Sequence, residues 1–183
     1  VYVNGTFNMY SGKITDNHVD VVSTYGGGGV CMSGGSFTMY DGEISGNTSA
    51  KRGGGIFATG NVTIKGGTIS RNTATTDGGG GVYYRCTSSD KSLTVSDTAQ
   101  ITENSAGGNG GGVYCSISAD SSSMTVSGSA KIAENSAGGK GGGIYVEQGT
   151  VKMTGGTISE NTATTKGGGV YYIGGSAKMF VSG

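Results

Sequence analysis

Three glutamates recur at one phase of an internal repeat and are the first residues to consider for chemistry. They are Glu103, Glu134 and Glu160. If the repeats stack as strands, neighbouring carboxylates lie about 4.8 Å apart, near the ~5–5.5 Å between the two carboxyl groups of a retaining glycosidase. Such a file could also attract a cation such as Ca²⁺. Because no cleft is indicated nearby, we interpret it as a solvated file neutralised by Arg71, Lys131 or counterions, and predict no catalytic residue and no firm metal site.

An aromatic residue follows the Val or Ile that opens most repeats. The positions are Tyr2, Phe57, Tyr83, Tyr114, Tyr145 and Tyr171, with Cys31 interrupting the series. Alternation with the inward Val or Ile predicts that these rings point outward, in which case Tyr84 and Tyr172 point inward. Stacked tyrosines can present a platform for sugar rings or a partner protein, because Tyr combines apolar area with a polar tip. The alternative is a structural stack that covers the glycine-rich backbone. The binding candidates are Tyr83, Tyr114, Tyr145 and Tyr171.

Two neighbouring repeats carry insertions of equal length, at residues 85–92 and 116–123. We expect these segments to protrude side by side. Loops on a rigid solenoid are common binding sites, and Asp90, Lys91 and Asp120 are the candidates for polar recognition. The alternative is that these inserted segments have no binding role. Another insertion, residues 18–25, falls on a different corner.

The elements that must position these residues recur every 26–31 residues. A glycine-rich run marks the approach to most starts, which lie at Val1, Val30, Ile56, Val82, Val113, Ile144 and Val170. Three short strands can be placed in each repeat. The first reads Val-Tyr-x, as at Val82. The second alternates apolar and polar residues, as around Leu93 and Val95, which is the pattern of a half-buried strand.

The third strand carries one inward Ile, and an Asn follows it three residues later. The isoleucines are Ile14, Ile44, Ile69, Ile101, Ile132 and Ile158. The asparagines are Asn17, Asn47, Asn72, Asn104, Asn135 and Asn161. A buried polar residue without a partner is costly, whereas stacked asparagines can hydrogen-bond to one another as in cross-β structures. We therefore predict an asparagine ladder, with Asn also adopting the left-handed conformation of the corner. A simple turn preference is the alternative.

These features predict an all-β fold, a right-handed single-stranded parallel β-helix of about seven coils with three short strands per coil. Parallel connections are almost always right-handed. Residues 1–183 form one domain, in which each coil buries its apolar face against its neighbours. The pattern begins in mid-coil at Val1 and stops at Gly183 without a polar cap. We therefore expect a fragment of a longer repeat protein, with further β-helix coils at both termini.

Composition narrows the partners and the chemistry. The formal net charge is +0 without a basic patch, which argues against nucleic acid. No apolar run approaches the ~20 residues of a membrane helix, so we expect membrane contact only through an anchor of the parent protein. Three cysteines without Cys-x-x-Cys spacing indicate no zinc site. Cys86 and Cys115 are offset by two positions, so free thiols are expected. A single histidine, His18, and the lack of a phosphate-binding motif argue against other catalytic chemistry and against a cofactor.

The repeat carries a family resemblance. Residues 79–83 (Gly-Gly-Gly-Val-Tyr) and 101–104 (Ile-Thr-Glu-Asn) are one instance of its two motifs. This pairing resembles the repeats of large bacterial and archaeal adhesin-like surface proteins. It is also similar to the paired short motifs of chlamydial polymorphic outer-membrane proteins and related autotransporter passengers. In the chlamydial pattern Phe precedes x-x-Asn, and its replacement by Ile favours the broader adhesin-like class. The resemblance implies a secreted or cell-surface protein and carries over no catalytic residue.

The leading hypothesis is a structural or adhesive stalk, not an enzyme, that presents a face to host or environmental glycans or surface proteins. The first alternative is a polysaccharide lyase or hydrolase, since many right-handed β-helices are such enzymes, and only the glutamate file could serve that chemistry. Ice binding is a weaker alternative. It would use an outward threonine file, Thr38, Thr63, Thr94 and Thr125, which Lys152 and Lys178 then interrupt.

Overall fold

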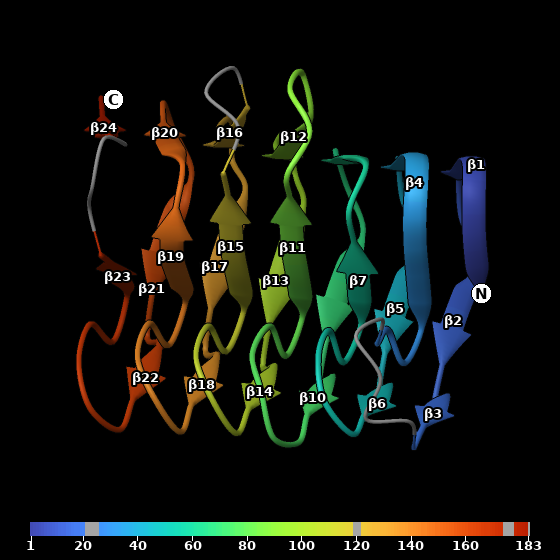
Figure 1. The fold of residues 1–183 in the computed structure, drawn as a ribbon, viewed down its shortest axis with the longest axis horizontal. Coiled ribbons are helices and arrows are strands. Elements are labelled where there is room, and N and C mark those ends of the chain that lie inside the picture. Colours follow the sequence, from blue (N-terminus) through green and yellow to red (C-terminus); the bar gives the residue numbers. More distant parts are fainter. Residues whose placement is uncertain (21–25, 119–121, 174–177, 183) are drawn as a thin grey trace.

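The computed structural model is a row of stacked coils that run from one end of a rod to the other (Figure 1). It describes residues 1–20, 26–118, 122–173 and 178–182. The strands of neighbouring coils pair in parallel, which confirms the predicted parallel β-helix. The right-handed turn stays a prediction from the connection rule. No helix within the described ranges is long and apolar enough to cross a membrane.

The coils build three sheets. The first, twelve-stranded sheet contains β1 (Tyr2–Met9), β4 (Val30–Met39), β7 (Ile56–Ala58), β8 (Asn61–Ile64), β11 (Val82–Cys86), β12 (Ser92–Val95), β15 (Val113–Ile117), β16 (Ser123–Val126), β19 (Ile144–Gln148), β20 (Thr150–Met153), β23 (Val170–Tyr172) and β24 (Met179–Val181). The second contains β2 (Lys13–Thr15), β5 (Glu43–Ser45), β9 (Thr68–Ser70), β13 (Gln100–Thr102), β17 (Lys131–Ala133) and β21 (Thr157–Ser159). The third contains β3 (His18–Val19), β6 (Thr48–Ser49), β10 (Thr73–Ala74), β14 (Ser105–Ala106), β18 (Ser136–Ala137) and β22 (Thr162–Ala163).

Each coil thus has three faces. The first and second predicted strands share the first sheet, and in the first two coils they are one continuous strand, β1 or β4. The predicted Ile strand forms the second sheet. The third sheet consists of two-residue strands after each Asn, which the repeat pattern did not reveal. Because the second and third sheets have six strands each, the described residues contain six complete coils, and the predicted count of about seven includes the partial coil of β23 and β24.

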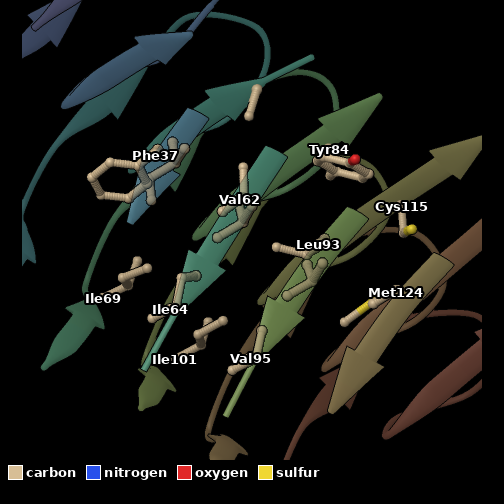
Figure 2. Close-up of a cluster of buried hydrophobic side chains, with 14 of the residues drawn as sticks. Phe37, Val62, Ile64, Ile69, Tyr84, Leu93, Val95, Ile101, Cys115 and Met124 are labelled. Atoms are coloured by element: carbon tan, nitrogen blue, oxygen red, sulfur yellow. The ribbon is translucent and has the colours of Figure 1, made fainter. Parts of the chain in front are cut away.

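The interior is one continuous column of apolar side chains, with a layer from each coil (Figure 2). Val62, Leu93 and Met124 occupy equivalent positions in neighbouring strands of the first sheet. Ile69 and Ile101 stack in the same way in the second sheet. All five side chains are fully buried. Since burying one such side chain contributes about 1.5–3 kcal/mol, stability accumulates coil by coil.

The asparagines form the predicted ladder beside this column. From Asn17 to Asn135, each Nδ2 donates to Oδ1 of the Asn in the next coil at 2.8–2.9 Å. The backbone N–H of each Asn donates to the same oxygen. From Asn47 onward, Nδ2 also donates to the Ile carbonyl of the preceding coil. Every Oδ1 beyond the first coil therefore accepts two bonds, so the buried amides are satisfied.

The ladder and the backbone of the next coil together explain the last glycine of most glycine-rich runs. A Cβ at Gly81 would lie 2.7 Å from the carbonyl oxygen of Gly112, 3.0 Å from Nδ2 of Asn104 and 3.0 Å from Cγ2 of Ile101. The equivalent contacts recur at Gly29, Gly55, Gly112 and Gly143, where a Cβ would lie 2.8–3.0 Å from the amide nitrogen of an Asn. The glycine-rich run and the Ile-x-x-Asn motif are thus two halves of one contact.

The left-handed residue at this corner is not the Asn, so that part of the prediction is wrong by one position. The residue before each Asn has a φ between 53° and 65°: Asp16, Gly46, Arg71, Glu103, Glu134 and Glu160. Four residue types occupy this left-handed position, whereas Asn is invariant in the next one. Hydrogen bonding along the ladder, and not turn preference, therefore explains the Asn.

Tyr84 points into the core, as the alternation predicts. Its neighbours in register are Ala58 and Cys115, whose small side chains leave room for the ring. Tyr84 is fully buried, and its hydroxyl has no hydrogen-bond partner among the described residues. The offset of Cys86 from Cys115 is confirmed by the pairing of Cys86 with Ile117, and the cysteines are free thiols.

Replacing Asn104 with Ala should lower the free energy of unfolding by about 2–5 kcal/mol. The change leaves two buried donors of Asn72 without an acceptor, and each such loss costs about 1–3 kcal/mol. Urea titration followed by circular dichroism measures this difference. The control is Asn8→Ala, at an exposed position of β1, which should be nearly neutral. Equal losses for the two variants would contradict the ladder as a source of stability.

Replacing Tyr84 with Phe should raise the free energy of unfolding by about 1 kcal/mol, because it removes an unsatisfied buried hydroxyl. Tyr114→Phe is the matched control, since the Tyr114 hydroxyl donates to Glu147 and its removal should not stabilise the protein. The same urea titration compares the two variants. Destabilisation by Tyr84→Phe would show that the hydroxyl has a partner that the structure does not reveal.

Candidate functional site

The aromatic residues form a continuous stack on the first sheet, but the stack is covered. The ring centroids of Phe57, Tyr83, Tyr114, Tyr145 and Tyr171 are separated in turn by 5.5, 4.4, 5.0 and 5.7 Å. The exposed fractions of Tyr83, Tyr114 and Tyr145 are 4%, 7% and 6%, and Tyr171 is half-buried. Of the two alternatives, the burial of these rings favours the structural stack over an open platform.

The glycine-rich loop that precedes β11 covers the rings. A Cβ at Gly78 would lie 2.6 Å from Cδ2 of Tyr114, so only a residue without a side chain lets the loop approach this closely. Arg52 lies over Tyr83, with its guanidinium carbon 5.1 Å from the ring centroid. Nε of Arg52 donates to Asp77 at 2.6 Å. The aromatic stack is thus a second, smaller core outside the main one.

A polar pocket of about 410 Å³ opens beside the stack. Its lining comes mainly from the outward residues of β11, β15 and β19, three neighbouring strands of the first sheet. Arg52, Arg85 and Glu147 supply its charges, and Tyr83, Thr87, Tyr114, Ser116 and Ser118 supply hydroxyl groups. Two of the predicted binding residues, Tyr83 and Tyr114, therefore contribute to a site, although not through open ring faces.

A β-bulge places Glu147 in this pocket. Cys115 pairs with Val146, and Ser116 pairs with Gln148, so Glu147 is the extra residue between them. Bulges re-aim side chains and are frequent beside functional sites. The Tyr114 hydroxyl donates to Oε2 of Glu147 at 2.7 Å. This bond orients the half-buried carboxylate at the edge of the stack.

The described parts of the inserted segments, residues 85–92, 116–118 and 122–123, lie side by side, as predicted. The backbone N–H of Lys91 donates to Oγ of Ser122 at 3.2 Å, and this hydroxyl donates to the carbonyl of Ser88 at 3.2 Å. Asp90 is exposed with a φ of 61°. Asp120 lies outside the described residues, as do residues 21–25 of the first insertion. Asp90 and Lys91 are not part of the pocket lining, and their role in binding stays a prediction.

The glutamate file is exposed at the corner before each Asn. Lys131 pairs with Glu134 at 3.3 Å, as expected for a solvated file, whereas Arg71 pairs with Glu43 at 3.7 Å. Within the described ranges, no group of three or more His, Cys, Asp or Glu side chains is placed to hold a metal ion. The weak calcium candidate formed by Glu103, Glu134 and Glu160 stays a prediction.

The threonine file is in register in the first sheet from Thr38 to Thr125. Lys152 follows Thr125, as predicted. Phe180, and not Lys178, occupies the next position, because pairing in the last coil begins two residues later than the repeat suggests. The file that ice binding would need therefore ends in a cation and an exposed aromatic ring.

One family matches the chain in three places. The Chlamydia polymorphic membrane protein repeat covers residues 41–59, 98–116 and 129–147. Each match begins before a strand of the second sheet, passes through a ladder Asn and reaches the next strand of the first sheet. No curated protein and no solved structure matches the chain.

These three matches, together with the parallel β-solenoid, fit a β-helix repeat protein similar to the polymorphic membrane proteins and autotransporter passengers. The match includes Ile44, Ile101 and Ile132 at the position where Phe was expected, so this substitution does not remove the likeness. Polymorphic membrane protein repeats belong to outer-membrane surface proteins, which supports a surface location in general terms.

Two charged residues of the pocket in this polymorphic membrane protein-like chain could not be identified from the sequence. Glu147 depends on a bulge, and bulges leave no clear signal in a repeat. Arg52 precedes the glycine-rich run of an earlier coil, and only the close approach of that run to the tyrosines brings it near β11. The sequence carried one signal for Glu147. In the repeat this acidic residue aligns with Arg85 and Ser116 of the two preceding coils, neither of which is acidic.

Stability should decrease in alkali, because burial raises the pKa values of Tyr83, Tyr114 and Tyr145 above their ordinary value. The Tyr114 pKa rises further because its hydroxyl donates to the Glu147 carboxylate. Unfolded tyrosines ionise near pH 10. The stabilisation is therefore fully present below about pH 10 and is lost as the pH rises above it.

Urea midpoints at pH 8, 10 and 11, with tyrosinate absorbance recorded in parallel, measure this effect. We expect the midpoint to fall above pH 10, and to fall less in a Tyr114→Phe, Tyr145→Phe double variant. A midpoint that is the same at pH 8 and pH 11 would show that the stack does not stay protonated in the folded protein.

Proposed function

We propose that the chain is a structural and adhesive stalk segment of a secreted or cell-surface adhesin-like protein. The observation that carries this proposal is the unbroken asparagine ladder through all six complete coils. It ties each coil to the next by side-chain bonds and leaves the outward positions free to vary. Three repeats of a surface-protein family support the same assignment.

The partners we propose are host or environmental glycans or surface proteins. The outward surface supports this choice, since paired insertions and a polar pocket lie together over β11 and β15. A rigid scaffold that carries polar loops is a common arrangement for recognition. Nucleic acid is not among the proposed partners, because the net charge is +0 and phosphate binding needs an excess of cations.

We propose a binding role and not catalysis. The glutamates that first suggested glycoside hydrolysis are exposed at a corner. The pocket holds one carboxylate among the described residues, Glu147, whereas both classes of glycosidase use a pair. A polysaccharide-degrading activity is the alternative outcome of the test below.

Attachment and turnover can be measured with the same preparation. The full 183-residue chain is coupled to beads, which are presented to immobilised mucin, glycosaminoglycans, plant and algal polysaccharides, and matrix proteins. We expect retention on at least one of these surfaces with no release of sugar fragments. Urea-unfolded chain on beads is the control and should not be retained. An antibody to residues 85–92 should label intact source cells without permeabilisation.

Two results would contradict the proposal. Release of oligosaccharides that is lost in Glu147→Gln or Glu134→Gln would assign the chain to the polysaccharide-degrading enzymes. Labelling only after cell lysis would exclude a surface segment, whatever the beads bind.

A further inference from the structure

The pocket beside the tyrosine stack contains an unpaired cation. Arg85 lies on β11 two residues after Tyr83, on the same outward face, and its side chain is exposed. No hydrogen bond or ion pair joins it to another residue in the described part of the chain. The other guanidinium in the pocket differs, because Asp77 already neutralises Arg52 at 2.6 Å. Arg85 is therefore the group available to bind an anion.

The pocket also contains a carboxylate with spare capacity. Tyr114 donates to Oε2 of Glu147, and Oε1 accepts no hydrogen bond from the described residues. An ionised carboxylate accepts several hydrogen bonds, so Oε1 is available to accept from the hydroxyl groups of a ligand. Because Glu147 is negative, a dianion such as phosphate would be repelled, whereas a ligand that combines one anionic group with several hydroxyls suits both residues.

The rest of the lining favours the same ligand chemistry. Thr87, Ser116 and Ser118 present hydroxyls that can donate or accept. The lining is mostly polar, and the neighbouring tyrosine rings are covered, so a lipid or an aromatic compound would find little apolar surface. The volume of about 410 Å³ lies at the lower end of the ~300–1,000 Å³ range of small-molecule pockets. A saccharide unit at the end of a glycan is of suitable size.

We propose that this pocket binds a carboxylated sugar, a uronic or sialic acid residue at the end of a glycan chain. Arg85 pairs with the sugar carboxylate, and guanidinium–carboxylate pairs are often bidentate. Oε1 of Glu147 accepts from sugar hydroxyls, and Ser116 and Ser118 complete the hydrogen bonding. The inference rests on the proposed function in one respect, namely that an exposed chain meets such glycans.

Titration of the isotope-labelled full chain by NMR tests the site. The probes are a glucuronic acid-terminated oligosaccharide, a sialic acid-terminated oligosaccharide, and the same two compounds with their carboxyl groups reduced to alcohols. We expect an acidic probe to shift the backbone signals of β11, β15 and β19, and its reduced form to bind at least about tenfold more weakly. Comparison of the glucuronic acid probe with the sialic acid probe shows which of the two acidic sugars the pocket binds.

Arg85→Gln, Lys91→Gln and Lys152→Gln each remove one positive charge, and of these three residues only Arg85 lines the pocket. Arg85→Gln should weaken binding about tenfold or more. Lys91→Gln reports whether the neighbouring insertion also contributes, and Lys152→Gln, at an exposed position of β20 outside the pocket, should leave binding nearly unchanged. Unchanged signals with both acids, equal binding of the reduced sugars, or binding by Arg85→Gln as strong as by Lys152→Gln would each overturn the inference. If the Arg85→Gln chain still attaches to beads or matrix while the acidic sugars fail, the stalk proposal stands and only the pocket assignment falls.

Discussion

The hydrogen bond from one ladder asparagine to the next fixes the register between coils, and the other features follow from that register. A single amide joins its own coil to the coils on both sides, through the next Asn and the preceding Ile carbonyl. The last glycine of most runs is required because a Cβ there would approach both the glycine carbonyl of the next coil and the ladder amide. Two motifs far apart in each repeat therefore encode one contact, which explains why they recur together.

The same register places outward residues above one another and so creates the surface features. The tyrosines stack because they occupy one column of the first sheet, and a glycine-rich loop can cover them because it too recurs in every coil. Local departures from the repeat then make one region distinctive. The insertions follow β11 and β15, and a bulge in β19 turns Glu147 into the pocket beside these strands. A uniform scaffold thus carries one irregular, polar site.

The inward-facing residues could be predicted from the sequence. The alternation of apolar and polar residues and the invariant Ile-x-x-Asn motif are together compatible with only one arrangement of the inward side chains. Alternation also oriented the outward tyrosines and the inward Tyr84 correctly. Their exposure could not be predicted, since it depends on how closely residues around Gly78 approach a ring in the next coil. The left-handed position before each Asn was misplaced, because Arg or Glu holds it in four of the six coils and these residues seldom adopt that conformation. The Glu147 bulge and the two-residue offset at Phe180 are shifts in the pairing of neighbouring strands. Such shifts can be recognised only when the strand pairing is known.

The most direct test of this account is hydrogen exchange of the asparagine side-chain amides, measured by NMR on the folded chain. Buried amides that bond to the neighbouring coil exchange only when the coils open. The account predicts that the Nδ2 protons of Asn72 and Asn104 exchange orders of magnitude more slowly than those of the exposed Asn8. Exchange of all three side chains at a similar, rapid rate would contradict a closed asparagine column and with it the coil-on-coil register.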